Sequence, residues 1–182
     1  MSPSILAHAL SALVLSAGTV AAQQPVQGPP PGVPSQGLDR RKLNGPRFGF
    51  TVFTGDVADR RNSAGLEPMM TQFGWQFETQ IMSTEGGNQA LMEWVVLIGG
   101  VEQDEFNLGV SWLAGYRAAN GIEFGVGPNI TFNKDSDEPT TSMIVAGGAT
   151  LPFGQIYVPL NMAVSIAQGG PRFTVLIGWI VE

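Results

Sequence analysis

The stretch that decides the fold is GIEFGVGPNITFN, residues 121–133. Successive side chains of a β-strand point to opposite faces, so alternate residues of this stretch form two sets. Apart from Pro128, the first set is Ile122, Phe124, Val126, Ile130 and Phe132. The second set is Glu123, Gly125, Gly127, Asn129 and Thr131. The alternation predicts a strand with one apolar face, which could meet either a protein core or lipid.

Seven further segments share this strand character, and turn-forming sequences such as Asn120-Gly121 separate them. The eight predicted strands are 46–54, 71–82, 90–100, 106–117, 121–132, 140–151, 156–166 and 171–181. Most have nine to twelve residues, close to the roughly nine to eleven that a tilted transmembrane strand needs. Strands of soluble proteins usually have about five or six. A short helical turn is expected within 56–66. We predict an all-β fold, an eight-stranded antiparallel up-and-down β-barrel.

The less apolar faces of these strands are rich in glycine and poor in charge. Strand positions that face water normally carry Lys, Glu, Thr, Ser or Arg, whereas small residues suit the crowded interior of an eight-stranded barrel. Apolar-out and small-or-polar-in is the pattern of a membrane barrel. The aromatic residues predicted to face lipid or its interface are Phe73, Trp75, Phe77, Trp94, Trp112, Tyr116, Phe124, Phe132 and Trp179.

A few charged residues fall on the predicted inner face, and isolated charges there would be costly. These residues are Arg47, Glu78, Glu93, Arg117 and Glu123. We hypothesise that they form an interior charge network, in preference to a paired-carboxylate catalytic site. Pro128 lacks the N–H that a closed barrel needs, so a β-bulge is expected there.

The first 45 residues differ in composition from the rest. Residues 1–22 resemble a secretory signal peptide, with an apolar run that ends in Val20-Ala21-Ala22; an N-terminal membrane anchor or a buried helix is the alternative. Residues 23–45 are rich in Pro, Gly and Gln, which predicts a disordered linker. The barrel is expected over 46–182.

Composition narrows the chemistry. The net charge is −6 and no stripe of Lys and Arg is present, so nucleic acid is not an expected partner. The chain has no Cys, and its one histidine, His8, lies in the predicted signal peptide. The usual zinc, copper and haem ligand sets and His-dependent nucleophiles would then be missing. We expect no cofactor, no metal and no enzyme; the acidic residues at 135, 137 and 138 are expected to form a solvated loop.

These segments resemble the small eight-stranded outer-membrane β-barrels of the OmpA/OmpX type, over about residues 46–182. The stretches TQFGWQFE and GVGPN also suggest a bacterial barrel family with no function to carry over. The resemblance implies a non-enzymatic integral protein of the outer membrane of a Gram-negative-type bacterium, with membrane lipid as partner and a structural or surface-interaction role. Any protein partner or small apolar ligand is left open.

Two alternatives remain at this point. The chain could be an exported soluble β-barrel or sandwich in the periplasm or outside the cell, binding an apolar ligand as lipocalin-like proteins do. A weaker alternative is a narrow channel gated by the interior Arg and Glu residues.

Overall fold

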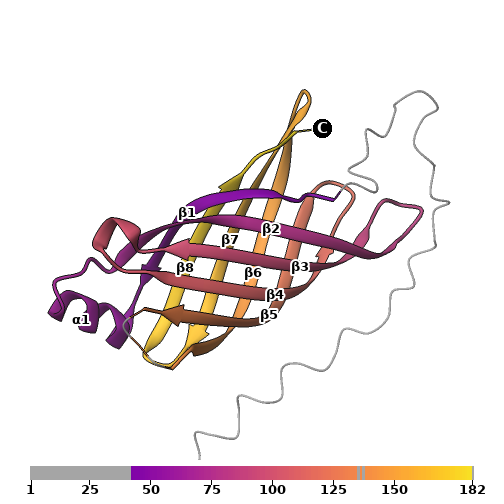
Figure 1. The fold of residues 1–182 in the computed structure, drawn as a ribbon. Coiled ribbons are helices and arrows are strands. Elements are labelled where there is room, and N and C mark those ends of the chain that lie inside the picture. The colour runs from indigo at the N-terminus through magenta and orange to yellow at the C-terminus, as the bar shows by residue number, and fades with distance from the viewer. Residues whose placement is uncertain (1–41, 135, 137, 182) are drawn as a thin grey trace, which may run out of the picture. The chain divides into compact units, whose positions relative to one another are not determined.

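The computed structural model describes residues 42–134, 136 and 138–181. The elements, in chain order, are β1 (Gly45–Phe53), α1 (Gly55–Ser63), β2 (Met69–Ser83), β3 (Gln89–Gly99), η1 (Val101–Gln103), β4 (Asn107–Arg117), β5 (Ile122–Asn133), β6 (Thr140–Phe153), β7 (Ile156–Ala167), β8 (Gly170–Gly178) and β9 (Ile180–Val181) (Figure 1). The predicted signal peptide and all but the end of the predicted linker lie outside the described residues.

The eight long strands form a closed barrel. Each pairs antiparallel with the next along the chain, and β8 pairs with β1, for example at Ile177 and Phe48. The two-residue strand β9 continues the line of β8 after Trp179 and pairs with β7. The predicted fold class is confirmed, and since the strands belong to one closed sheet, the sandwich form of the soluble alternative is wrong.

The strand around Pro128 corrects one sequence-based expectation. Ser111 pairs with Asn129 and Ala114 pairs with Val126, so the register of β4 and β5 is the same on both sides of the proline. No residue is inserted, and the expected bulge is therefore wrong; the ladder is only interrupted between these two pairs. The two strands approach closely at this interruption, and only a glycine fits at position 127, since a Cβ there would lie 1.9 Å from the carbonyl oxygen of Trp112.

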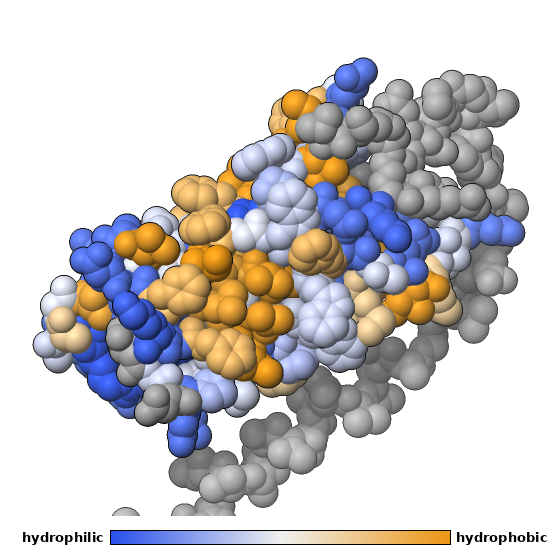
Figure 2. Space-filling model, in the orientation of Figure 1, coloured by the Kyte–Doolittle hydropathy of each residue, from blue (hydrophilic) through white to orange (hydrophobic). Residues whose placement is uncertain are grey.

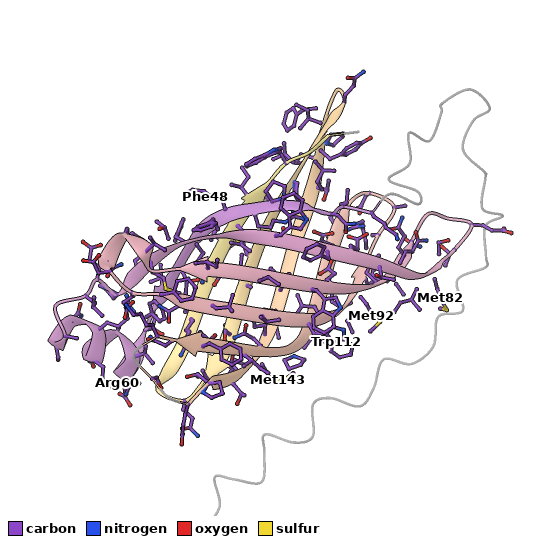
Figure 3. The ribbon with its side chains drawn as sticks, viewed as in Figure 1. Phe48, Arg60, Met82, Met92, Trp112 and Met143 are labelled. Atoms are coloured by element: carbon purple, nitrogen blue, oxygen red, sulfur yellow. The ribbon has the colours of Figure 1, made fainter. Side chains whose placement is uncertain are left out.

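Side chains alternate between the interior and the outer surface as the pattern predicts. In β5 every second residue from Glu123 to Asn129 is buried, and the residues between them are exposed. Hydrophobic residues gather over the middle of the strands, and hydrophilic residues gather at the end that carries α1 (Figure 2). The side chains of Phe48, Met82 and Met143 point away from the barrel (Figure 3) and are half or more exposed. Many large apolar residues therefore lie on the surface.

The connections differ between the two ends of the barrel. One end carries the turns β2–β3, β4–β5 and β6–β7 and the start of β1. The other end carries α1, η1 and the connections β5–β6 and β7–β8. We call these the terminal end and the helix end. In the described part of the chain, no helix is long and apolar enough to cross a membrane.

Candidate functional site: the barrel interior

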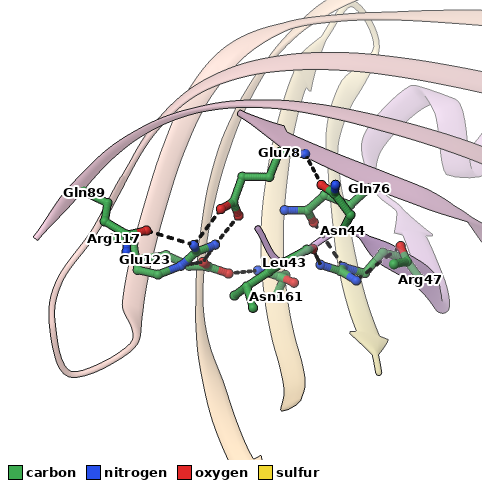
Figure 4. A network of polar contacts seen from close by, with 10 residues as sticks. Leu43, Asn44, Arg47, Gln76, Glu78, Gln89, Arg117, Glu123 and Asn161 are labelled. Atoms are coloured by element: carbon green, nitrogen blue, oxygen red, sulfur yellow. Dashed lines mark hydrogen bonds and ion pairs between the residues drawn. The ribbon is translucent and has the colours of Figure 1, made fainter. Parts of the chain in front are cut away.

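The terminal end of the interior is closed by a network centred on Arg117. Its Nε donates a hydrogen bond to Glu123 Oε2 at 2.8 Å, and its Nη1 donates to Glu78 Oε1 at 2.8 Å (Figure 4). Nη2 forms ion pairs with both carboxylates. The Arg117 residue is only 1% exposed. A guanidinium buried this deeply needs both carboxylates, because water cannot reach its N–H groups to accept their hydrogen bonds.

Strand register explains why these side chains meet. Arg117 lies directly opposite Glu123 on β5 and opposite Gln89 on β3. Glu123 Oε1 also accepts a hydrogen bond from Asn161 Nδ2 on β7, at 2.8 Å. The network thus joins strands that are far apart in the barrel wall, and it fills the space between them.

Arg47 lies beside this network but is satisfied in a different way. Its Nε donates to Gln76 Oε1 at 3.0 Å, and its Nη2 donates to the carbonyl of Leu43 at 3.2 Å. Leu43 is 1% exposed, and the side chain of Asn44 accepts the backbone N–H of Glu78 at 2.6 Å. Within the described residues, the guanidinium bonds to an amide and to carbonyls and not to a carboxylate. The segment just before β1 therefore helps to close the terminal end.

Glu93 is the member of the predicted set that stands apart. It lies directly opposite Glu78 on β2 and is 8% exposed. Arg117 pairs with Glu78 and Glu123, and no described residue forms a hydrogen bond or an ion pair with the Glu93 carboxylate. The structure thus places Arg117, Glu78 and Glu123 in contact, Arg47 beside them, and Glu93 nearby without a hydrogen bond or an ion pair to a described residue.

A cavity of about 320 Å³ occupies the rest of the interior, toward the helix end. It ends at Gln76, Glu93 and Asn161, two of which also belong to the polar contacts of the terminal end. Its apolar wall is formed by Val95, Leu97, Leu113, Ile144, Ala146 and Leu176. The cavity therefore begins where the charge network stops.

A chain of hydrogen bonds between short polar side chains crosses the wall of this cavity. Asn129 accepts from the Ser111 hydroxyl at 3.0 Å and donates to Ser142 Oγ at 3.2 Å. Ser165 Oγ and Ser142 Oγ are 2.8 Å apart. These side chains satisfy one another along the wall and are too short to fill the centre of the barrel.

Arginines and the helix α1 line the mouth of the cavity. The N–H of Val57 donates to the carbonyl of Gly169 at 3.0 Å, which ties α1 to the connection before β8. Arg61 forms an ion pair with Glu105 at 2.7 Å, and its Cζ lies 4.4 Å from the centre of the Phe53 ring. Arg172 lies over the same ring at 5.6 Å. Sequence reasoning missed Arg61 and Arg172, although Arg172 has the same parity as the inward residues of its strand.

The predicted aromatic residues lie on the outer surface. Eight of the nine are exposed, and Trp112 is half-buried against Trp94, with ring centres 6.3 Å apart. Phe77, Trp94 and Trp112 occupy neighbouring positions on β2, β3 and β4. Tyr116 and Phe124 form a second pair across β4 and β5, at 5.8 Å. The aromatic side chains thus form rows across adjacent strands.

Comparisons give no family for this chain. The described residues contain no group of three or more His, Cys, Asp or Glu that could hold a metal ion; residues 135 and 137 of the acidic loop lie outside them. Comparison with protein-family models, curated protein sequences and solved structures finds no match. The functional argument therefore rests on the geometry of the barrel.

Proposed function

We propose that this protein is a non-enzymatic integral outer-membrane β-barrel with a structural or surface-interaction role. One observation carries the proposal: every charged residue within the eight long strands is on the inward side. These residues are Arg47, Glu78, Glu93, Arg117, Glu123 and Arg172. The outward positions of the same strands carry no Asp, Glu, Lys or Arg in the described chain.

This distribution fits lipid better than water. A soluble barrel gains solubility and protection against association from charges on its outer strands, and large exposed apolar patches favour aggregation. Here exposed positions include Phe73, Trp94 and Phe124, each about half or more exposed. In a bilayer, exposure of those same side chains to lipid is favourable, whereas an outward Arg or Lys near the midplane would cost about 2–4 kcal/mol.

Orientation follows from the usual arrangement of such barrels, in which short turns face the periplasm and longer loops face outside. The turns at 118–121 and 154–155 are short and lie at the terminal end, whereas the longest connection, 54–68, carries α1 at the helix end. We infer that the helix end faces the outside of the cell. A surface-interaction role would then belong to α1 and η1.

Fractionation tests the proposal directly. The full chain, expressed in a Gram-negative host, should be recovered in the outer-membrane fraction and should migrate differently on SDS gels with and without heating. A folded membrane barrel resists SDS until it is heated. Recovery as a monomer in the periplasm without detergent would overturn the proposal.

A single charge on the outer surface gives a second test. Val126 lies in the middle of β5 and is 44% exposed. In lipid, Val126→Arg should lower the free energy of unfolding by about 2–4 kcal/mol, measured by urea titration of the barrel refolded in vesicles. Glu85→Arg, in the exposed β2–β3 turn, is the control and should change it by less than about 0.5 kcal/mol. Equal effects of the two variants would argue against a lipid-facing surface.

The cavity favours one alternative role. A soluble lipocalin-like barrel also encloses a cavity that holds a small ligand, and the cavity here has an apolar wall. The fractionation experiment separates the two roles, because the soluble barrel would not enter the membrane fraction.

A further inference from the structure

We propose that the cavity is a binding site for a small amphipathic amine, and that the ammonium group of this amine pairs with Glu93. The inference goes beyond the proposed function and does not depend on lipid, because the cavity lies inside the closed barrel. The argument has three parts: the charge at the inner end of the cavity, the size and polarity of its wall, and the groups at its mouth.

At the inner end of the cavity, the buried carboxylates outnumber the buried guanidiniums by one. Near the terminal end, three carboxylates, those of Glu78, Glu93 and Glu123, are buried with two guanidiniums, those of Arg47 and Arg117. Arg117 is held by Glu78 and Glu123, and Arg47 by an amide and by carbonyls. Glu93 is more than nine-tenths buried and forms no hydrogen bond or ion pair with a described residue. A buried charge is costly unless a counter-charge reaches it, and the open side of Glu93 is the cavity.

A second acceptor lies at the cavity surface. Asn161 Oδ1 is buried and has no hydrogen-bond partner among the described residues, whereas its Nδ2 is held by Glu123. An ammonium group has three donors and no acceptor. It could therefore use Glu93 for its charge and an amide oxygen such as that of Asn161 for a second hydrogen bond.

The cavity wall determines the polarity and the size of the rest of the ligand. Val95, Leu113 and Leu176 form the buried apolar cluster of the interior and line the cavity. An alkyl group packed against this wall would break no hydrogen bond, and it would remove apolar surface of both the ligand and the wall from water. The volume of about 320 Å³ is near the lower end of the range for ligand pockets, about 300–1,000 Å³. The ligand should therefore be small.

The mouth of the cavity indicates why only one end of the ligand is charged. The guanidiniums of Arg60, Arg61 and Arg172 and the single carboxylate of Glu105 line it, so the mouth carries more positive than negative charge. Arg172 and Asn107 line the mouth, and Arg172 Nε and Asn107 Nδ2 are buried donors without a partner in the described chain. The arginines disfavour a second positive charge at the mouth, and the two unpaired N–H donors would donate hydrogen bonds to a neutral acceptor on the ligand.

The binding test uses the full chain purified in detergent and three probes with the same six-carbon body. Isothermal titration at neutral pH should show 1-aminohexane binding with one site, and 1-hexanol and hexanoate binding at least about tenfold more weakly. Glu93→Gln should weaken 1-aminohexane binding by about ten- to hundredfold, because a charge-assisted hydrogen bond is lost. Partition of the amine into micelles is the same for both proteins and cancels in this comparison.

Two variants complete the test. Glu85→Gln removes an exposed carboxylate and should leave binding unchanged. Ala146→Leu narrows the cavity without touching a charge and should also weaken binding, which keeps the test decisive if Glu93→Gln does not fold. Equal affinity of the wild type for amine and alcohol, stronger binding of hexanoate, or unchanged affinity in Glu93→Gln or Ala146→Leu would overturn the proposal.

Discussion

The two ends of the barrel interior are made by the same alternating strands but are filled in opposite ways. At the terminal end, long side chains reach across the barrel, and Arg117 joins Glu78 and Glu123. At the helix end, serines and threonines bond to their neighbours along the wall, as Thr51 Oγ1 does to Thr174 Oγ1 at 2.6 Å. Side-chain length and pairing therefore decide where an eight-stranded barrel is closed and where it encloses a cavity.

The difference also separates two kinds of stability. The terminal end depends on the ion pairs of Arg117 with Glu78 and Glu123, which must stay paired because all three side chains are buried. The helix end depends on neutral hydrogen bonds, each of which contributes only about 1 kcal/mol net. Substitutions should therefore have larger effects at the terminal end.

Removing the centre of the network should have the largest effect. Arg117→Ala leaves Glu78 and Glu123 buried without their cation. We expect the free energy of unfolding to fall by about 3–5 kcal/mol, measured by urea titration of the refolded barrel. Adding Glu78→Gln and Glu123→Gln to the same chain should recover much of this loss, because the unpaired charges are gone.

The control for this series is Lys134→Ala, since Lys134 is exposed at the helix end. Its effect should be within about 0.5 kcal/mol. If Arg117→Ala were no more destabilising than the control, the network would not be what closes the terminal end.

A pair of inward glycines tests where the interior has room. Gly127 does not line the cavity, and a Cβ there would lie 1.9 Å from the Trp112 carbonyl oxygen. Gly109 lines the cavity, and its Cβ would be no closer than 3.8 Å to any neighbour. Gly127→Ala should destabilise the barrel by about 1–3 kcal/mol through overpacking, whereas Gly109→Ala should be nearly neutral. Unfolding midpoints of the two variants measure this, and equal shifts would contradict it.

The smallest effect is expected at the η1 connection of the helix end. The Glu102 carboxylate accepts the N–H of Thr71 at 2.6 Å and the Thr71 hydroxyl at 2.7 Å. Slight burial tends to raise the pKa of Glu102, but these hydrogen bonds outweigh it and lower the pKa below its ordinary value. A lowered folded-state pKa gives stability that is present above the unfolded-state pKa and is lost as the pH falls through the folded-state pKa.

The Glu102→Gln variant tests this interpretation. Its unfolding midpoint should lie slightly below that of the wild type at about pH 7, and the difference should shrink toward about pH 3, below the ordinary pKa of Glu. A difference that does not change with pH would mean that the carboxylate's charge contributes nothing to the η1 connection.

Much of the fold could be predicted because its signal is local. Alternation along 121–133 places Glu123 and Asn129 inside and Phe124 and Val126 outside, and the structure has this arrangement. Parity also indicates that Arg117 points inward. It does not say which partner an inward charge meets, since that depends on the register of strands distant in sequence. Arg117 therefore pairs with two carboxylates, whereas Glu93 forms no ion pair with a described residue.

The interruption at Pro128 shows the same limit. The sequence indicates a missing donor, but a bulge and an interrupted ladder are equally compatible with one proline. The close approach of β4 at Gly127 makes the second solution possible, and nothing local in β5 reveals it. Arg61 and Arg172 were missed because their shared contact with Phe53 joins three separate segments.

The sequence by itself determined the strands, their two faces and the inward direction of the strand charges, because a strand fixes side-chain direction with a period of two residues. Only the tertiary structure decided the closure of β8 on β1, the pairing of Arg117, the lack of an ion pair between Glu93 and any described residue, and the position of the cavity. These features depend on which residues of different strands lie opposite one another, and that is set when the whole barrel closes.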